Sequence, residues 1–76
     1  MGKITLPELG EGIEKAVVAG WLCKVGERVE KDQEVVELVT DKASFSVTSD
    51  SSGVLGEIYV NEGEEAAIGQ TLAKIE

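Results

Sequence analysis

One lysine stands where a primary amine could do chemistry. Lys42 follows Asp41 between two stretches that read as β-strands, residues 34–40 and 43–48, so it is predicted to lie at the tip of a tight turn. After the turn, apolar residues alternate with hydroxyl residues, which places the apolar set on one face. The Asp-Lys pair fits a type I turn, because primed turns favour Asn-Gly or Asp-Gly. A lone lysine in a turn is usually a solvated charge, but an exposed amine on a flexible stem is also a possible site of covalent modification, and we advance modification of Lys42 as the hypothesis.

Other chemistries have little support in the sequence. The chain has no histidine, which removes the commonest general base and metal ligand, and no nucleophile-base pair or metal-ligand cluster is visible. The single cysteine, Cys23, cannot form an internal disulfide. It lies in residues 21–25, an apolar stretch that reads as a strand, so we predict a small core residue rather than a reactive thiol. Trp21 is likewise predicted to be a packing residue.

The composition describes a small acidic domain. The 76 residues include 15 acidic and 7 basic side chains, for a formal net charge of -8. Such a surface repels nucleic acid and anionic lipid, so neither is expected as a partner. It suits partners with basic docking patches, and it also serves solubility, and the two interpretations are compatible. No run of 18 apolar residues exists, so no membrane-spanning segment is expected.

Turn residues recur every few positions, and no stretch supports an amphipathic helix of useful length. This pattern predicts a small all-β sandwich or barrel. The predicted strands and the predicted turn clusters alternate along the chain, with strands at residues 4–6, within 15–25, at 34–40, 43–48, 54–60 and 71–75.

An internal repeat with an offset of 37 residues organises these strands. Gln33 recurs as Gln70, and apolar and turn positions coincide over much of both copies. Two similar β units packed face to face predict a quasi-twofold sandwich. At this offset Lys42 corresponds to Thr5 in the first copy and to a position just past the C-terminus in the second. The lysine turn is therefore expected at the opposite pole from both termini.

Four segments carry a resemblance to a known family: residues 6–13 (LPELGEGI), 21–27 (WLCKVGE), 40–44 (TDKAS) and 53–55 (GVL). In this order and spacing they resemble the lipoyl domain of the dihydrolipoamide acyltransferase component of 2-oxo acid dehydrogenase complexes. The resemblance covers residues 3–76. It implies a flattened barrel of two four-stranded antiparallel sheets, and it implies lipoic acid attached to Lys42 by an amide bond.

The resemblance also implies roles around the lysine. Asp41 and Ala43 flank it as in the family, where they help the decarboxylase to accept the lipoyl group. The surface loop with Glu8, Leu9, Gly10, Glu11 and Gly12 corresponds to a loop that folds near the lipoyl turn and contributes to the same recognition. Two simpler interpretations stay open. Asp41 could only favour the turn, and the glycines could only supply backbone freedom.

The implied partners are those of a carrier. A thiamine-dependent 2-oxo acid decarboxylase reduces and acylates the lipoyl group, the acyltransferase core passes the acyl group to coenzyme A, and dihydrolipoamide dehydrogenase reoxidises the dithiol. A lipoate ligase or lipoyl-synthesis enzymes attach the cofactor. We expect residues 1–76 to be a monomeric domain, not an enzyme by itself, at the N-terminus of a longer acyltransferase chain. The expected compartment is the cytoplasm of a bacterium or archaeon, or the mitochondrial matrix of a eukaryote.

Four alternatives remain. The biotinyl carrier domain shares the fold, but it brackets its lysine with methionines, whereas the one methionine here is Met1. The lipoate-bearing carrier protein of glycine cleavage is longer. An unmodified adaptor domain and a stand-alone enzyme are the remaining classes. Among the 2-oxo acids, residues 40–44 resemble the pyruvate and branched-chain versions more than the 2-oxoglutarate version, which often has Val after the lysine.

Overall fold

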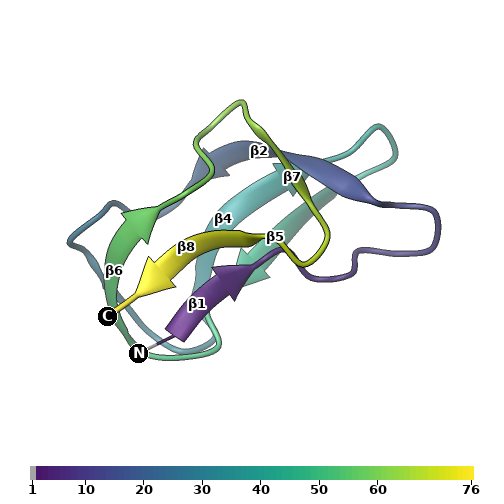
Figure 1. The fold of residues 1–76 in the computed structure, drawn as a ribbon. Coiled ribbons are helices and arrows are strands. Elements are labelled where there is room, and N and C mark those ends of the chain that lie inside the picture. Colours follow the sequence, from purple (N-terminus) through teal and green to yellow (C-terminus); the bar gives the residue numbers. More distant parts are fainter. Residues whose placement is uncertain (1) are drawn as a thin grey trace.

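The computed structural model describes residues 2–76, which form eight β-strands in two four-stranded antiparallel sheets (Figure 1). This architecture confirms the predicted all-β sandwich. The strands, in chain order, are β1 (Gly2–Thr5), β2 (Lys15–Trp21), β3 (Arg28–Val29), β4 (Glu34–Val39), β5 (Ser44–Thr48), β6 (Gly53–Ile58), β7 (Glu65–Ala67) and β8 (Thr71–Ile75). One sheet has the order β1-β8-β6-β3 and the other has the order β5-β4-β2-β7.

The core lies between the two sheets and consists of inward-facing strand residues together with Leu6, Cys23 and Val60 from the connections. In β4, Val35, Val36 and Leu38 are fully buried, while Glu34 and Glu37 are exposed. The period of two is interrupted in β4 at Val35 and Val36, where the register shifts, but it is regular beyond the turn, where burial increases from exposed Ala43, through half-buried Phe45, to buried Val47. The predicted apolar face therefore exists, and its end nearest the turn projects beyond the core.

The two halves of the chain are related by a quasi-twofold axis, as the repeat predicted. Val18 pairs with Leu38 between β2 and β4, and their counterparts Leu55 and Ile75 pair between β6 and β8. Both registers shift directly after these pairs, so each half carries the same β-bulge at the same place. The orders of the two sheets also match strand for strand under this relation.

Turns in the two halves are closed in the same way. The Glu27 carboxylate accepts a hydrogen bond from the backbone N–H of Lys24, and Glu64 accepts the equivalent bond from Asn61. Gly26 and Gly63, which precede these glutamates, have φ of +92° and +88°. A positive φ favours glycine because it has no Cβ, so this shared turn geometry explains the repeated Gly-Glu pair.

The offset between the halves changes at β1 and β5. Leu6 N–H donates to the Gln70 carbonyl, and the equivalent bond in the other half joins Ser49 N–H to the Gln33 carbonyl. Leu6 therefore corresponds to Ser49, and the prediction that Thr5 corresponds to Lys42 was wrong. The reason is that residues 6–14 connect β1 to β2, whereas only residues 49–52 connect β5 to β6, so an offset of 37 cannot hold on both sides of this connection.

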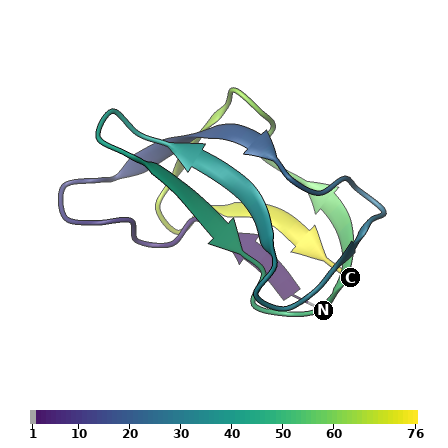
Figure 2. The ribbon, with the colours of Figure 1, turned by 180° about the vertical axis from the view of Figure 1, so that it is seen from behind.

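The predicted poles are nevertheless confirmed. The β4–β5 turn lies at one end of the molecule, and the start of β1 and the end of β8 lie at the other (Figures 1 and 2). Gly2 pairs with Ile75 in the β1–β8 ladder, which holds the two ends side by side. The long β1–β2 connection, purple in both views, lies at the same end as the turn.

The sequence pattern was wrong about residues 22–25. The strand ends at Trp21. Leu22 N–H makes a last bond to the Val35 carbonyl, and the chain then bends away before the turn at Gly26. Cys23 is buried all the same, as predicted. No helix among residues 2–76 is long and apolar enough to cross a membrane.

Candidate functional site

The candidate site is the β4–β5 hairpin turn, where Lys42 is exposed as predicted. Val39 and Ser44 form the last ladder pair, and Asp41 and Lys42 stand at the tip. Among residues 2–76, the one non-glycine residue with positive φ is Asp32, so both tip residues keep negative φ. Primed and type II turns require positive φ at the tip. The observed backbone therefore agrees with the type I turn expected for an Asp-Lys pair.

The hydroxyl of Thr40 ties this turn together. It accepts hydrogen bonds from the backbone N–H groups of Lys42 and Ala43, at 3.2 Å and 3.1 Å, and it donates to the Ala43 carbonyl at 3.1 Å. The Thr40 backbone N–H also donates to the Ala43 carbonyl, at 2.8 Å. The sequence analysis did not single out Thr40. The signal was present, because a Ser or Thr hydroxyl commonly accepts bonds from backbone N–H groups two and three residues later.

The Lys42 amine is exposed and makes no ion pair within residues 2–76. Three of the seven cationic side chains are engaged in ion pairs, in which Lys15 contacts Glu65, Arg28 contacts Glu30, and Lys74 contacts Glu76. Of the remaining lysines, Lys42 is the one at the tip of a hairpin between two long neighbouring strands. Lys42 is exposed there.

The β1–β2 connection, residues 6–14, forms a loop that lies beside Lys42. Its base is fixed, because Leu9 packs against the core and the Glu14 carbonyl accepts a bond from Ile68 N–H. At its tip, Gly12 comes so close that a Cβ built on it would lie 3.8 Å from the Lys42 Nζ. The expectation that this loop folds near the lysine turn agrees with this placement.

The five loop residues singled out from the sequence have different environments. Glu8 and Glu11 are exposed, whereas Leu9 anchors the loop through its half-buried side chain. Gly10 and Gly12 have φ of +148° and +83°, so both positions need the backbone freedom of glycine. The two glycines therefore have a backbone role, and the two glutamates are exposed at the surface.

Loop and turn together border a surface depression. Its volume is about 360 Å³, and Gly12, Ile13, Glu14 and Thr40 line it together with the tip residues Asp41 and Lys42. Ala43 is exposed at the end of the turn. Asp41 and Ala43 therefore flank Lys42 as exposed residues.

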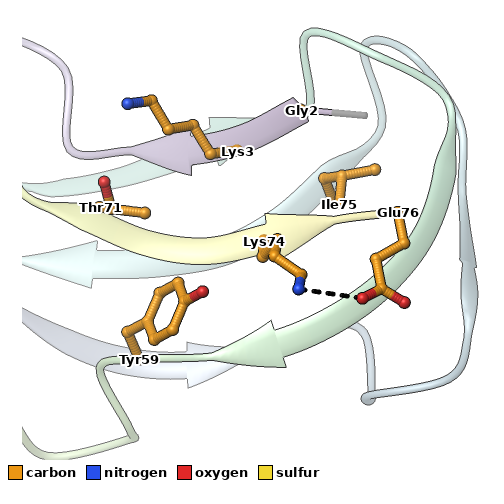
Figure 3. A pocket seen from close by; sticks show the side chains of 7 residues that line it. All are labelled: Gly2, Lys3, Tyr59, Thr71, Lys74, Ile75 and Glu76. Carbon is orange, nitrogen blue, oxygen red and sulfur yellow. Dashed lines mark ion pairs between the residues drawn. The ribbon is translucent and has the colours of Figure 1, made fainter.

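A larger hollow lies at the opposite end of the molecule (Figure 3). It is an open groove on the outer face of β1, β8 and β6, where Lys74 pairs with Glu76 at 3.1 Å beside Tyr59. The pKa of Lys74 is raised, first by the hydrogen bond from its amine to Glu76. This ion pair is exposed, and the groove lacks a set of converging reactive groups.

Cys23 and Trp21 serve the structure, as predicted. Burial raises the pKa of the Cys23 thiol, and the nearby charge of Glu27 raises it further, so the reactive thiolate is disfavoured. The Trp21 ring packs against the core, and its Nε1–H donates to the Val60 carbonyl at 2.9 Å. No group of three or more acidic, cysteine or histidine side chains within residues 2–76 is arranged to hold a metal ion.

Comparison with family models places this site in a known context. The model described as "Biotin-requiring enzyme", for a family of biotin and lipoyl domains, matches residues 2–75. The match therefore covers both halves of the barrel, the loop and the Lys42 turn.

Two curated relatives match over nearly the whole chain. One is the dihydrolipoyllysine-residue succinyltransferase component of the 2-oxoglutarate dehydrogenase complex from Staphylococcus saprophyticus, which is 41% identical over 75 residues. The other is the acetyltransferase component of the pyruvate dehydrogenase complex from Staphylococcus epidermidis, which is 35% identical over 71 residues. These matches cover 99% and 93% of this chain, but only 18% and 16% of the two relatives.

A solved structure of the same size is also similar. The lipoyl domain of the 2-oxoglutarate dehydrogenase complex from Azotobacter vinelandii is 36% identical and superimposes with a TM-score of 0.78. The match covers 100% of this chain and 96% of that domain. This chain and that domain are therefore similar in sequence and in fold over their whole matched length.

Proposed function

Because this chain belongs to the lipoyl domains of the biotin and lipoyl family, we propose that it carries lipoic acid on Lys42. Exposure of the Lys42 amine at the tip of a braced hairpin is the observation that carries this proposal. Attachment joins Nζ to the carboxyl carbon of lipoate in an amide. ATP activates the carboxyl group as an anhydride with AMP and pyrophosphate leaves; the amine then displaces AMP, and the original ammonium group loses two protons in all. The modified lysine is then neutral.

The residues around Lys42 fit such a group. The amine is free of ion pairs among the described residues, and Gly12 leaves space beside it where any other residue would place a Cβ. The neighbouring depression is open to solvent and its lining is polar and apolar in similar parts. The geometry suits an arm that extends into solvent and reaches other proteins.

When bound, the lipoyl group supplies a dithiolane that can accept electrons and an acyl group. The protein contributes position and recognition. We assign the partners accordingly: a thiamine-dependent 2-oxo acid decarboxylase that loads the arm, an acyltransferase core that unloads it, and dihydrolipoamide dehydrogenase, which restores its oxidised state. Tethering such an arm to the same assembly replaces free diffusion by a high effective concentration.

Recognition by the decarboxylase is assigned to the surface that flanks the amine. Asp41 and Ala43 are exposed on either side of Lys42, and Glu8 and Glu11 project from the neighbouring loop. Together with the net charge of -8, these carboxylates favour partners with basic docking surfaces.

The parent protein of this domain is also a proposal. The chain spans 16–18% of the curated relatives' length. We propose that it forms the N-terminal lipoyl domain of a dihydrolipoamide acyltransferase, in the cytoplasm of a bacterium or archaeon or in the mitochondrial matrix. The relatives include both succinyltransferase and acetyltransferase components, so the similarity is compatible with a 2-oxoglutarate or a pyruvate complex. The sequence around the lysine favours pyruvate or a branched-chain 2-oxo acid.

The deciding experiment is an intact mass measurement after incubation with lipoate, ATP and a lipoate ligase. A parallel reaction uses biotin, ATP and a biotin ligase, because the matching family model includes biotin-requiring enzymes. We expect one lipoyl increment, mapped to Lys42 by peptide analysis, and no biotinyl increment. A biotinyl increment would move the domain to the carboxylases, and no increment from either ligase would support an unmodified adaptor.

The matched control is Lys42→Arg. Arginine keeps the positive charge but offers no amine that can be acylated under these conditions, so this variant should fold normally and stay unmodified. Continued lipoylation of the folded variant would refute Lys42 as the attachment site.

A further inference from the structure

The turn that carries Lys42 is braced differently from the symmetric turns of the barrel. In each half, one turn is closed by a glutamate and another by a glutamine, and in all four the side chain of the last turn residue accepts the bond. Thus Gln33 accepts from Glu30 N–H, and Gln70 accepts from Ala67 N–H. In the Lys42 turn the accepting side chain belongs to the first residue, Thr40. This difference concerns the turn for which the twofold relation supplies no counterpart.

A brace placed before the lysine fixes its backbone and leaves its side chain free. The Thr40 hydroxyl receives the N–H groups of Lys42 and Ala43 and donates to the Ala43 carbonyl, so one oxygen joins three backbone groups. All these bonds involve the main chain of the turn, and none involves the Lys42 amine. The direction in which the side chain leaves the backbone is thereby set without contact to the reactive nitrogen.

We propose that Thr40 is a positioning residue whose hydroxyl holds the Lys42 turn in the conformation that the lipoyl-attaching enzyme recognises. The proposal rests on the lipoyl-carrier function proposed above and extends it to a residue that touches neither the cofactor nor the amine. Thr40 is half-buried at the end of β4, so its own backbone is fixed by the sheet. It can therefore transmit the rigidity of the hairpin to the tip.

Without the hydroxyl, the backbone N–H groups of Lys42 and Ala43 would bond to water, and the tip would sample several conformations. The enzyme would have to select the competent one, which raises its apparent KM in proportion to the population lost. Loss of these bonds should lower kcat/KM about tenfold. This corresponds to about 1.4 kcal/mol, which is the order of magnitude expected for the hydrogen bonds that are lost. The rate at saturating domain should change much less.

Two substitutions separate the hydroxyl from the methyl group. Thr40→Val keeps the branched shape and removes both the acceptor and the donor, whereas Thr40→Ser keeps the hydroxyl and removes the methyl. The matched control is Thr48→Val, the same substitution at an exposed position of β5 in the same hairpin. For each variant, lipoate ligase kinetics are measured together with the melting temperature and the amide hydrogen exchange of residues 40–44.

The wild-type domain first tests the carrier function itself, since failure of wild type to accept lipoate would overturn that function and this proposal with it. If wild type is lipoylated, Thr40→Val should show a KM raised about tenfold and faster exchange at Lys42 and Ala43. Thr40→Ser and Thr48→Val should resemble wild type in both. Unchanged KM and exchange in Thr40→Val would overturn the positioning role and leave the carrier function intact. An equal loss in Thr48→Val, or no rescue by Thr40→Ser, would also overturn it.

Discussion

The connection from β1 to β2 and the connection from β5 to β6 occupy equivalent places in the two halves but differ in form. In the second half, residues 49–52 cross between the strands by a short path, and Ser49 is buried there. In the first half, residues 6–14 cross by a longer path that reaches Lys42, and Leu6 takes the equivalent buried position. The strands obey the twofold relation, whereas the surface around the lysine departs from it. A symmetric frame thus supports an asymmetric functional end.

The largest effects should come from the symmetric frame and should be equal in its two halves. Leu38 and Ile75 are equivalent, fully buried core residues on β4 and β8. Leu38→Ala and Ile75→Ala should each lower the free energy of unfolding by about 2–5 kcal/mol, because each leaves a cavity. Urea denaturation measures both. A large loss in one variant and a negligible loss in the other would break the equivalence of the two halves.

The next effect should be confined to the functional end. Asp41→Asn removes a charge beside Lys42 and should slow reductive acylation by a 2-oxo acid decarboxylase about tenfold, which corresponds to about 1.4 kcal/mol. Its unfolding free energy should stay within about 0.5 kcal/mol of wild type, as for other exposed positions. The control is Asp32→Asn in a turn of the frame, where φ is +71° and Asn is well tolerated. Normal acylation of the Asp41→Asn variant together with a large loss of stability would show that Asp41 only favours the turn.

Two glycines, one in the loop beside Lys42 and one in a turn far from it, allow a finer comparison of the two regions. Gly12 and Gly26 have φ of +83° and +92°, so Gly12→Ala and Gly26→Ala should each cost about 1 kcal/mol of stability. A Cβ on Gly12 would lie 3.8 Å from the Lys42 Nζ, whereas a Cβ on Gly26 would meet nothing within 4 Å. Lipoylation of Gly12→Ala should therefore be slower by a few-fold, and that of Gly26→Ala unchanged. Equal lipoylation rates would show that the loop does not influence the amine.

The smallest effect concerns an equivalent core pair, Cys23 and Val60. Burial raises the pKa of the Cys23 thiol above 9.0, its ordinary value, so the unfolded chain loses this proton first as the pH rises. The stability associated with the neutral thiol is present below pH 9 and is lost as the pH rises through the folded-state pKa. Cys23→Val, which makes the two positions identical, should lose less stability between pH 8 and 10 than wild type. Urea denaturation at both pH values tests this, and identical losses would contradict it.

Patterns that extend over many residues predicted the fold. The alternation around the hairpin, the recurring turns and the repeat of Gln33 as Gln70 predicted the sheets, the quasi-twofold relation and the two poles. Short or interrupted elements were harder to predict. β3 and β7 contain two and three residues, which is too few for a periodic signal. The apolar run at residues 21–25 reads as a strand, but the strand ends at Trp21, and of the residues that follow in a bend Cys23 is buried whereas Leu22 and Val25 are exposed.

The candidate site was predicted unevenly for a similar reason. Lys42 and its exposure follow from one turn in the sequence, and the proximity of residues 8–12 followed from a family resemblance. The change of offset between β1 and β5 depends on the length of one connection, which a constant repeat cannot express. The brace made by Thr40 depends on the direction of a single hydroxyl, which the residue type permits but does not require.

The pairing of Gly2 with Ile75 has a consequence for how the barrel could be rewired. A short linker between residue 76 and residue 2 would complete the hairpin between β8 and β1, the counterpart of the β4–β5 turn. New chain ends could then be opened at an exposed turn of the frame, as tolerated circular permutants often are. A lysine at the tip of the new hairpin would occupy the place of Lys42 under the twofold relation. Such a permutant could carry a prosthetic group at each pole.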